Sequence, residues 1–312
     1  MMWFVLVFAA IKRYFDAAQP KADIDEEFHK TNIRDKVGKE RVKYDLHYSK
    51  GRKNNVIVFC HGATSDETAW VTPDRAATKK WLAMQGTEDF PDGLLDDEYP
   101  HVLCLSFGWK WLLSPPGYDR RRGERDATVP IFKYLIEKHL KEYLGEGYQE
   151  THNLVLAGSS MGAHNVLQMY THHPEMFDAF IAHNPLLLDY DWDDEGPADM
   201  LYKWEFRRGN YDQIAPNHPL AMQKIKADHP YPPLMIQASV YDEMKFYKPV
   251  VKYANELKAK GVGVQFYKNL GGHNDMDEVT VAAFLNHVFK KEETPDEVKP
   301  DPNVIHDPVD GE

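Results

Sequence analysis

Five short apolar runs recur along this chain, and they limit its fold more than any other feature. They are VIVFC (56–60), HVLCLSF (101–107), NLVLAG (153–158), AFIAH (179–183) and LMIQAS (234–239). Because these runs are apolar along nearly their whole length, they indicate strands buried on both faces, as in a parallel sheet. Residues 41–48 alternate between polar and apolar instead, which predicts an exposed antiparallel strand.

Helical patterns separate these runs. Apolar residues share one helix face at Val129, Phe132, Leu135, Ile136, Leu140 and Tyr143, and again at Val281, Phe284, Leu285, Val288 and Phe289. The alternation predicts an α/β fold with a mostly parallel central sheet and helices on both faces. Residues 86–99 and 186–231 are longer than ordinary connections, so they are expected to be loop excursions that form a lid over the carboxyl edge of the sheet.

The length and composition fit one enlarged domain. The chain has 312 residues, of which 43% are hydrophobic, enough for one large core. Residues 1–40 are expected to be an apolar N-terminal segment and lead-in, and residues 41–290 the folded domain, with residues 186–231 as an insertion. Residues 291–312 carry eight acids, two lysines and four prolines, which predicts a disordered acidic tail.

Charge and the N-terminus bear on partners and location. The net charge of −12 disfavours nucleic acid and anionic membrane surfaces as partners, because phosphates would be repelled. The N-terminal sequence MMWFVLVFAAIKRYF holds an apolar run of about eleven residues, too short for a stable transmembrane span. The sequence favours a cytoplasmic location but leaves export, or membrane association through this segment, open.

A nucleophile elbow is the most specific motif in the chain. In the run NLVLAGSSMGAH, a strand meets Gly158-Ser159-Ser160-Met161-Gly162 and then a segment that can form a helix. This is the G-x-S-x-G pattern in the strand-turn-helix setting that it requires, with glycines where the chain must reverse tightly. The pattern predicts Ser160 as an exposed nucleophile.

A serine nucleophile needs a base to take its proton and an acid to orient that base. The run VGVQFYKNLGG (262–272) is expected to hold the last strand. His273 follows it directly after Gly271 and Gly272 and is the expected base, because imidazole titrates near neutral pH. Asp242 follows the run LMIQAS at the carboxyl edge and is the expected acid, with neighbouring Glu243 as the competitor.

The tetrahedral intermediate needs two hydrogen-bond donors for its oxyanion. The Met161 amide is expected to supply one, and the loop HGAT (61–64) the other, through Ala63 or alternatively Gly62. Trp109 and Trp111 are candidates for substrate binding, with simple packing as the alternative. No cofactor or metal is expected, because the histidines lack a metal-binding spacing and the acidic loop 189–199 lacks a calcium-binding pattern.

Through HGAT, GSSMG, Asp242 and GGH (271–273), the chain resembles the α/β-hydrolase superfamily over roughly residues 42–290. Residues 158–185 look like the elbow region of esterase D-like and polyhydroxybutyrate depolymerase-like esterases, although Ala163 stands where many esterases have a second glycine. Residues 231–261 resemble the catalytic domain of prolyl oligopeptidases, but their propeller domain is absent. The resemblance implies an α/β-hydrolase fold and ester hydrolysis without a cofactor.

These observations lead to one main expectation and two alternatives. The chain is expected to be a serine hydrolase, a carboxylesterase that cleaves a small-molecule ester through a covalent acyl-enzyme. The first alternative is a prolyl oligopeptidase-like peptidase or amide hydrolase that acts on short peptides. The second is a binding protein that keeps the fold without catalysis, which the intact Ser160, Asp242 and His273 disfavour.

Overall fold

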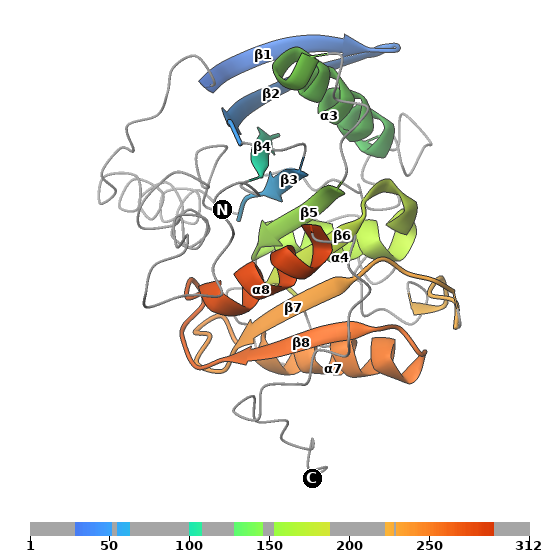
Figure 1. Cartoon of the computed structure of the whole chain (residues 1–312), viewed down its shortest axis with the longest axis vertical. Coiled ribbons are helices and arrows are strands. Elements are labelled where there is room, and N and C mark those ends of the chain that lie inside the picture. Colours follow the sequence, from blue (N-terminus) through green and yellow to red (C-terminus); the bar gives the residue numbers. More distant parts are fainter. Residues whose placement is uncertain are drawn as a thin grey trace, which may run out of the picture.

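An eight-stranded sheet forms the centre of the molecule (Figure 1). The computed structural model describes residues 29–51, 55–62, 100–107, 128–145, 153–187, 222–227 and 229–289. The strands are β1 (His29–Val37), β2 (Glu40–Ser49), β3 (Asn55–Cys60), β4 (His101–Ser106), β5 (Asn153–Ser159), β6 (Ala179–His183), β7 (Leu234–Ser239) and β8 (Val264–Asn269). They lie in the order β1-β2-β4-β3-β5-β6-β7-β8.

The strands from β4 to β8 in this order are parallel, as the apolar runs predict. Every residue of β3, β4, β6 and β7 is buried, because helices cover both faces of the sheet. The mostly parallel sheet of an α/β fold is therefore confirmed.

The antiparallel edge differs from expectation. β2 pairs antiparallel with both β1 and β4, so it is not an outer strand. The antiparallel pairing predicted for residues 41–48 is confirmed, but the predicted exposure is wrong for much of the strand, because Tyr44 and Tyr48 are 1% exposed, Leu46 is fully buried, and His47 on the opposite face is 3% exposed. In addition, β1 joins the sheet before residue 41, where the sequence placed the start of the folded domain.

Helices cover both faces of the sheet. They are α3 (Thr128–Leu144), α4 (Met161–His172), α7 (Tyr247–Ala259) and α8 (Glu278–Phe289), with a short 3-10 helix η4 (Pro174–Met176) after α4. The apolar sides of α3, α4 and α7 belong to one hydrophobic cluster, and that of α8 belongs to a second cluster on the other face. Both predicted helical stripes, in α3 and α8, are buried as expected, except that Tyr143 is partly exposed.

The parallel direction brings the carboxyl ends of β3, β5, β6, β7 and β8 to one edge. The predicted excursion 86–99, most of the excursion 186–231, the N-terminal segment before residue 29 and the tail 291–312 lie outside the described residues. Within the described part of the chain, no helix has the length and apolar character needed to cross a membrane.

Candidate active site

Ser160 lies in a strained turn between β5 and α4. Its backbone has φ 56° and ψ −116°, a conformation that is rare for a residue with a side chain. Three backbone hydrogen bonds hold it. The Ser160 amide donates to the His183 carbonyl at 3.0 Å, and its carbonyl accepts from the amides of His164 at 3.0 Å and Leu186 at 3.1 Å. The turn is therefore fixed by β6, by the loop after β6 and by the first turn of α4.

The two glycines of the motif are required by close approaches. A Cβ on Gly162 would lie 1.9 Å from the Cys60 carbonyl oxygen, so the start of α4 packs directly on the end of β3. A Cβ on Gly158 would lie 2.6 Å from the Gly162 carbonyl carbon. No side chain fits at either position without moving the backbone, which explains the spacing that the sequence displays.

Asp242 and His273 are in direct contact. The His273 Nδ1 lies 3.0 Å from Oδ1 and 3.1 Å from Oδ2 of Asp242. The Asp242 side chain is 1% exposed and that of His273 is 11% exposed, so the contact is nearly dry. The Met244 amide donates to Asp242 Oδ1 at 2.7 Å and fixes the carboxylate. Phe246 adds an edge-on ring contact to His273, with 5.4 Å between the ring centroids.

Glu243 has a different role in this geometry. Its Oε2 accepts a hydrogen bond from the His273 backbone amide at 3.0 Å, while Asp242 contacts the imidazole. A Cβ on Gly272 would lie 3.1 Å from the same Oε2, and a Cβ on Gly271 would lie 2.3 Å from the Asp275 side chain. Gly271 and Gly272 therefore let the loop before His273 approach the side chains of Asp275 and Glu243 closely.

Asn184 joins the histidine loop to the end of β6. Its Nδ2 donates to the His273 carbonyl at 2.6 Å and to the Ser239 hydroxyl at 2.8 Å, and its Oδ1 accepts from the Ser239 amide at 2.6 Å. The residue has φ 42°, in the left-handed region that asparagine tolerates better than most residues. Because His183, one residue earlier, accepts from the Ser160 amide, this short segment contacts both the elbow and the histidine loop.

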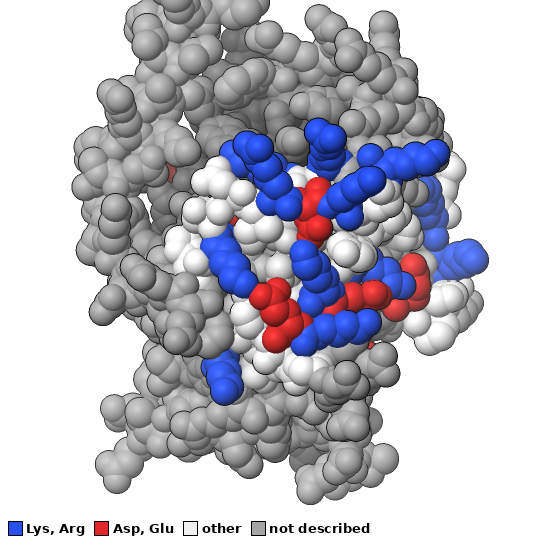
Figure 2. Space-filling model, turned by 90° about the horizontal axis from the view of Figure 1, so that it is seen from above, with Lys and Arg blue, Asp and Glu red and all other residues white. Residues whose placement is uncertain are grey.

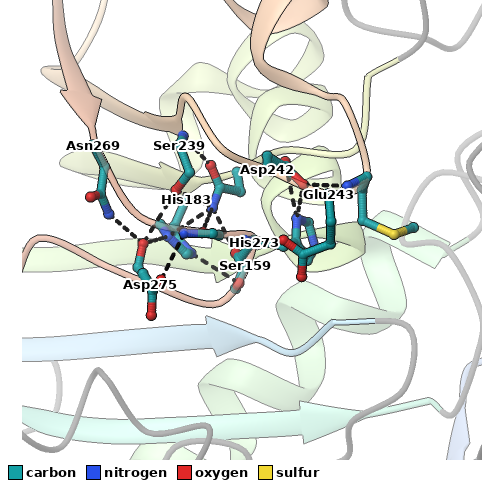
Figure 3. A network of polar contacts seen from close by, with 11 residues as sticks. Ser159, His183, Ser239, Asp242, Glu243, Asn269, His273 and Asp275 are labelled. Carbon is teal, nitrogen blue, oxygen red and sulfur yellow. Dashed lines mark hydrogen bonds and ion pairs between the residues drawn. The ribbon is translucent and has the colours of Figure 1, made fainter.

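A second serine and histidine lie beside this arrangement (Figure 3). The Ser159 hydroxyl is 3.1 Å from Nδ1 of His183, and Nε2 of His183 is 2.9 Å from the Asp275 carbonyl oxygen. Since a carbonyl can only accept, Nε2 donates to it and Nδ1 accepts from Ser159. Complete burial lowers the pKa of His183 to about 4, so this imidazole is neutral at pH 7.

The loop after β3 lies against the elbow. A Cβ on Gly62 would be 3.4 Å from the Ser160 Cβ, so the backbone of this loop passes beside the expected nucleophile. His61 holds the loop in place, because its Nδ1 is 2.8 Å from the Gly62 carbonyl and its Nε2 is 2.9 Å from the Ser106 hydroxyl at the end of β4. The Met161 amide begins α4 directly after Ser160.

Some predicted site residues fall outside the described chain. Ala63, the preferred second oxyanion donor, and Trp109 and Trp111, the candidates for substrate binding, are among them. Within the described chain, no cluster of three or more His, Cys, Asp or Glu side chains is arranged to hold a metal ion.

Sequence reasoning missed His183, Asn184 and the structural use of Glu243. One signal could have found the first two. They end the run AFIAHN, and polar residues that directly follow a buried parallel strand gather at the carboxyl edge with the reacting groups.

Comparisons with known proteins agree with this architecture. Residues 136–287 match the model of the prolyl oligopeptidase family, a segment that contains Ser160, Asp242 and His273. No curated protein sequence is significantly similar to the chain.

The fold is similar to that of solved esterases. An arylesterase structure has 15% identity and a TM-score of 0.55, covering 90% of this chain and 91% of that one. A thermostable esterase from Pseudomonas putida has 14% identity and a TM-score of 0.52, covering 90% and 85%. A ferulic acid esterase has 15% identity and a TM-score of 0.52, covering 83% and 96%.

Proposed function

We propose that this protein, which has the fold of the α/β-hydrolase superfamily, is a serine hydrolase that cleaves a carboxylic ester through an acyl-enzyme on Ser160. The observation that supports the proposal is the presence of two features at one sheet edge. One is a serine held at φ 56° between β5 and α4, and the other is a nearly dry Asp242–His273 contact. Nucleophilic catalysis by serine needs a positioned hydroxyl and a base that takes its proton, and these two features would supply them.

In this proposal, His273 is the general base. Its Nδ1–H donates to the Asp242 carboxylate, which leaves Nε2 unprotonated and able to accept the Ser160 hydroxyl proton. The Ser160 Oγ attacks the ester carbonyl carbon, and the carbonyl π electrons move to the oxygen. Asp242 stabilises the imidazolium that forms and keeps the ring in the correct tautomer, without taking the proton itself.

Backbone amides would stabilise the negative oxygen of the tetrahedral intermediate. The Met161 amide begins α4, where the unpaired amides and the helix dipole favour negative charge. The second donor would come from the loop after β3, through Ala63 or Gly62. The approach of Gly62 to Ser160 supports this loop as the source.

The reaction then closes in two steps. The intermediate collapses, the imidazolium gives its proton to the leaving alkoxide, and the alcohol departs to leave the acyl group on Ser160. Water, deprotonated by His273, attacks the acyl carbon, and the carboxylic acid leaves while Ser160 recovers its proton. Trp109 and Trp111 stay candidates for contact with the acyl or alcohol part.

Amide hydrolysis is the second candidate function. The match of residues 136–287 to the prolyl oligopeptidase family favours it, while the three solved structures compared above are esterases. Both reactions use the same acyl-enzyme, so the site geometry serves either. Short peptide amides and simple esters, assayed on one preparation, separate the two.

The test combines active-site labelling with turnover. Wild type, Ser160→Ala, His273→Ala and Asp242→Asn are incubated with a fluorophosphonate probe and with p-nitrophenyl acetate and butyrate. Ser159→Ala is the matched control, because it removes a hydroxyl one residue from the proposed nucleophile. Circular dichroism establishes that each variant is folded.

We expect Ser160→Ala to lose labelling completely and Ser159→Ala to retain it. Loss with Ser159→Ala and retention with Ser160→Ala would overturn the assignment of the nucleophile. A folded wild type that neither labels nor turns over any ester or peptide would favour the binding-protein alternative.

A further inference from the structure

Lysine and arginine side chains gather over the edge of the molecule formed by β1, β2 and α3 (Figure 2). Four of them form one surface, which we call the cationic hairpin face: Arg34, Lys36, Arg41 and Lys43. The register places Arg34 directly opposite Lys43 and Lys36 directly opposite Arg41. Because side chains alternate along a strand, all four lie on the face turned away from α3, and all are exposed.

These four cations differ from the basic residues on the α3 side. There, Lys30 pairs with Glu142 at 2.6 Å and Lys138 pairs with Asp35. Among the described residues, no ion pair joins any member of the cationic hairpin face. Asp45, which lies farther along the same face of β2, accepts the Asn32 backbone amide.

This arrangement has a cost in stability. Like charges directly opposite each other on neighbouring strands are destabilising, and here two such pairs are adjacent. Charges on an edge strand can be explained as protection against edge-to-edge pairing. That explanation covers Arg34 and Lys36 on β1. It bears less directly on Arg41 and Lys43, which stand on the second strand of the hairpin and pair with β1.

We propose that the cationic hairpin face docks this protein onto an anionic lipid surface. The net charge of the whole chain, −12, disfavours such a surface, but it averages over all faces, whereas the four exposed side chains of the cationic hairpin face are all positive. Clustered cations are attracted to the negative cytoplasmic leaflet within a Debye length. The inference does not depend on the proposed hydrolase activity.

The sequence before β1 favours lipid over nucleic acid. Residues 1–11 are apolar and are followed by Lys12 and Arg13, fewer than twenty residues before the hairpin. A short apolar segment binds a bilayer only weakly by itself, and stable attachment takes a second signal such as a basic patch. The N-terminal segment and the cationic hairpin face supply these two signals in neighbouring parts of the chain.

Vesicle sedimentation of the full chain tests the proposal. The vesicles are phosphatidylcholine alone, or phosphatidylcholine with about 30% phosphatidylserine, a composition that makes the surface negative. The test variant replaces Arg34, Lys36, Arg41 and Lys43 by Gln. The matched control replaces four exposed lysines away from this face by Gln: Lys226, Lys248, Lys252 and Lys258.

We expect wild type and control to bind the phosphatidylserine vesicles at least about ten-fold more tightly than the test variant. Wild-type binding should weaken as salt rises from about 0.01 M to about 0.15 M, because the Debye length falls from about 30 Å to about 8 Å. Equal losses in test variant and control, or no loss in the test variant, would overturn the proposal. Wild-type binding to a single-stranded RNA but to neither vesicle would do the same.

A second variant separates loss of vesicle binding from loss of folding. Arg34→Glu with Lys36→Glu makes both cross-strand pairs attractive and brings the charge of the face to zero. We expect it to be at least as stable as wild type and to lose vesicle binding. Stable protein that still binds as wild type would overturn the proposal. Deletion of residues 1–18 separates the two signals, since it removes the apolar segment and leaves the face intact.

Discussion

Two buried histidines at the same sheet edge have opposite surroundings. His273 bonds a carboxylate, that of Asp242, whereas His183 bonds a backbone carbonyl, that of Asp275. A carboxylate stabilises an imidazolium and a carbonyl does so much less. For His183 the effect of burial therefore exceeds that of its hydrogen bond, and its pKa falls to about 4. The Ser159 hydroxyl lies beside His183, and the proposed reaction pairs Ser160 with His273. The other partner of each ring, a carbonyl or a carboxylate, therefore distinguishes the structural histidine from the proposed base.

The largest expected effect comes from exchanging the two rings for the same side chain. His273→Gln should lower kcat by about 10⁴-fold or more, because no base remains for Ser160. His183→Gln should lower it by no more than about ten-fold, because the glutamine amide can still donate to the Asp275 carbonyl. Ester turnover of both purified variants gives the comparison. Equal losses in two folded variants would contradict the distinction between the histidines.

The two neighbouring acids provide the next test. Asp242→Asn should lower kcat by about 10⁴-fold, since the amide favours the wrong tautomer of His273. Glu243→Gln should cost about ten-fold at most, because its amide oxygen can still accept the His273 backbone amide. Steady-state kinetics on the same ester measures both. A larger loss in Glu243→Gln would mean that Glu243 is the acid.

Much of this fold was readable from periodicity. Five apolar runs became β3 to β7, five of the six parallel strands, and two helical stripes became α3 and α8, because burial on two faces or on one stripe leaves a direct mark on the sequence. β1 left no such mark. Its sequence HKTNIRDKV has few apolar residues, since one of its faces is exposed and only the other packs towards α3.

The candidate site divides in the same way. Motif spacing and strand order were enough to nominate Ser160, His273 and the pair Asp242 and Glu243. The choice between the two acids depends on the turn after β7, where the Met244 amide bonds Asp242 and aims it at the imidazole. Such a turn is set by tertiary contacts, which no local pattern reports. The Asn184 bridge was hidden for the same reason.

Asn184 connects the two histidines, because it directly follows His183 and its side chain donates a hydrogen bond to the His273 carbonyl. Asn184→Gly keeps the left-handed backbone and removes the side-chain bonds to His273 and Ser239, together with the Nδ2 contacts to His183 Nε2 at 3.1 Å and to the Gly272 carbonyl at 3.5 Å. We expect kcat to fall by about ten-fold with KM little changed, since the base loses a support rather than the substrate a contact. Asn184→Ala adds backbone strain and should also lower the melting temperature. A change confined to KM would show that Asn184 acts on substrate binding.

The smallest effect is a dependence of stability on pH that His183 carries. Its pKa is about 4 when folded, while an unfolded histidine titrates near 6.5. Between these values the unfolded chain binds more protons, so the free energy of unfolding falls as pH drops from about 6.5 to about 4. His164, whose pKa burial also lowers to about 4, adds a change of the same sign. Burial is the largest influence on the pKa of His183; the hydrogen bond to the Asp275 carbonyl and the charges of Asp242 and Asp275 raise this pKa, and His273 lowers it.

Urea unfolding between pH 7.5 and 4.5 measures this dependence. Each buried histidine contributes up to about 1.4 kcal/mol per pH unit inside the window, so His183→Gln should remove up to that much of the wild-type slope. His229→Gln is the matched control, because His229 is exposed. An unchanged slope in His183→Gln would mean that this ring gains a proton in the folded protein as readily as in the unfolded chain. His183 could then no longer be distinguished from His273, the proposed base, by staying neutral in the folded protein.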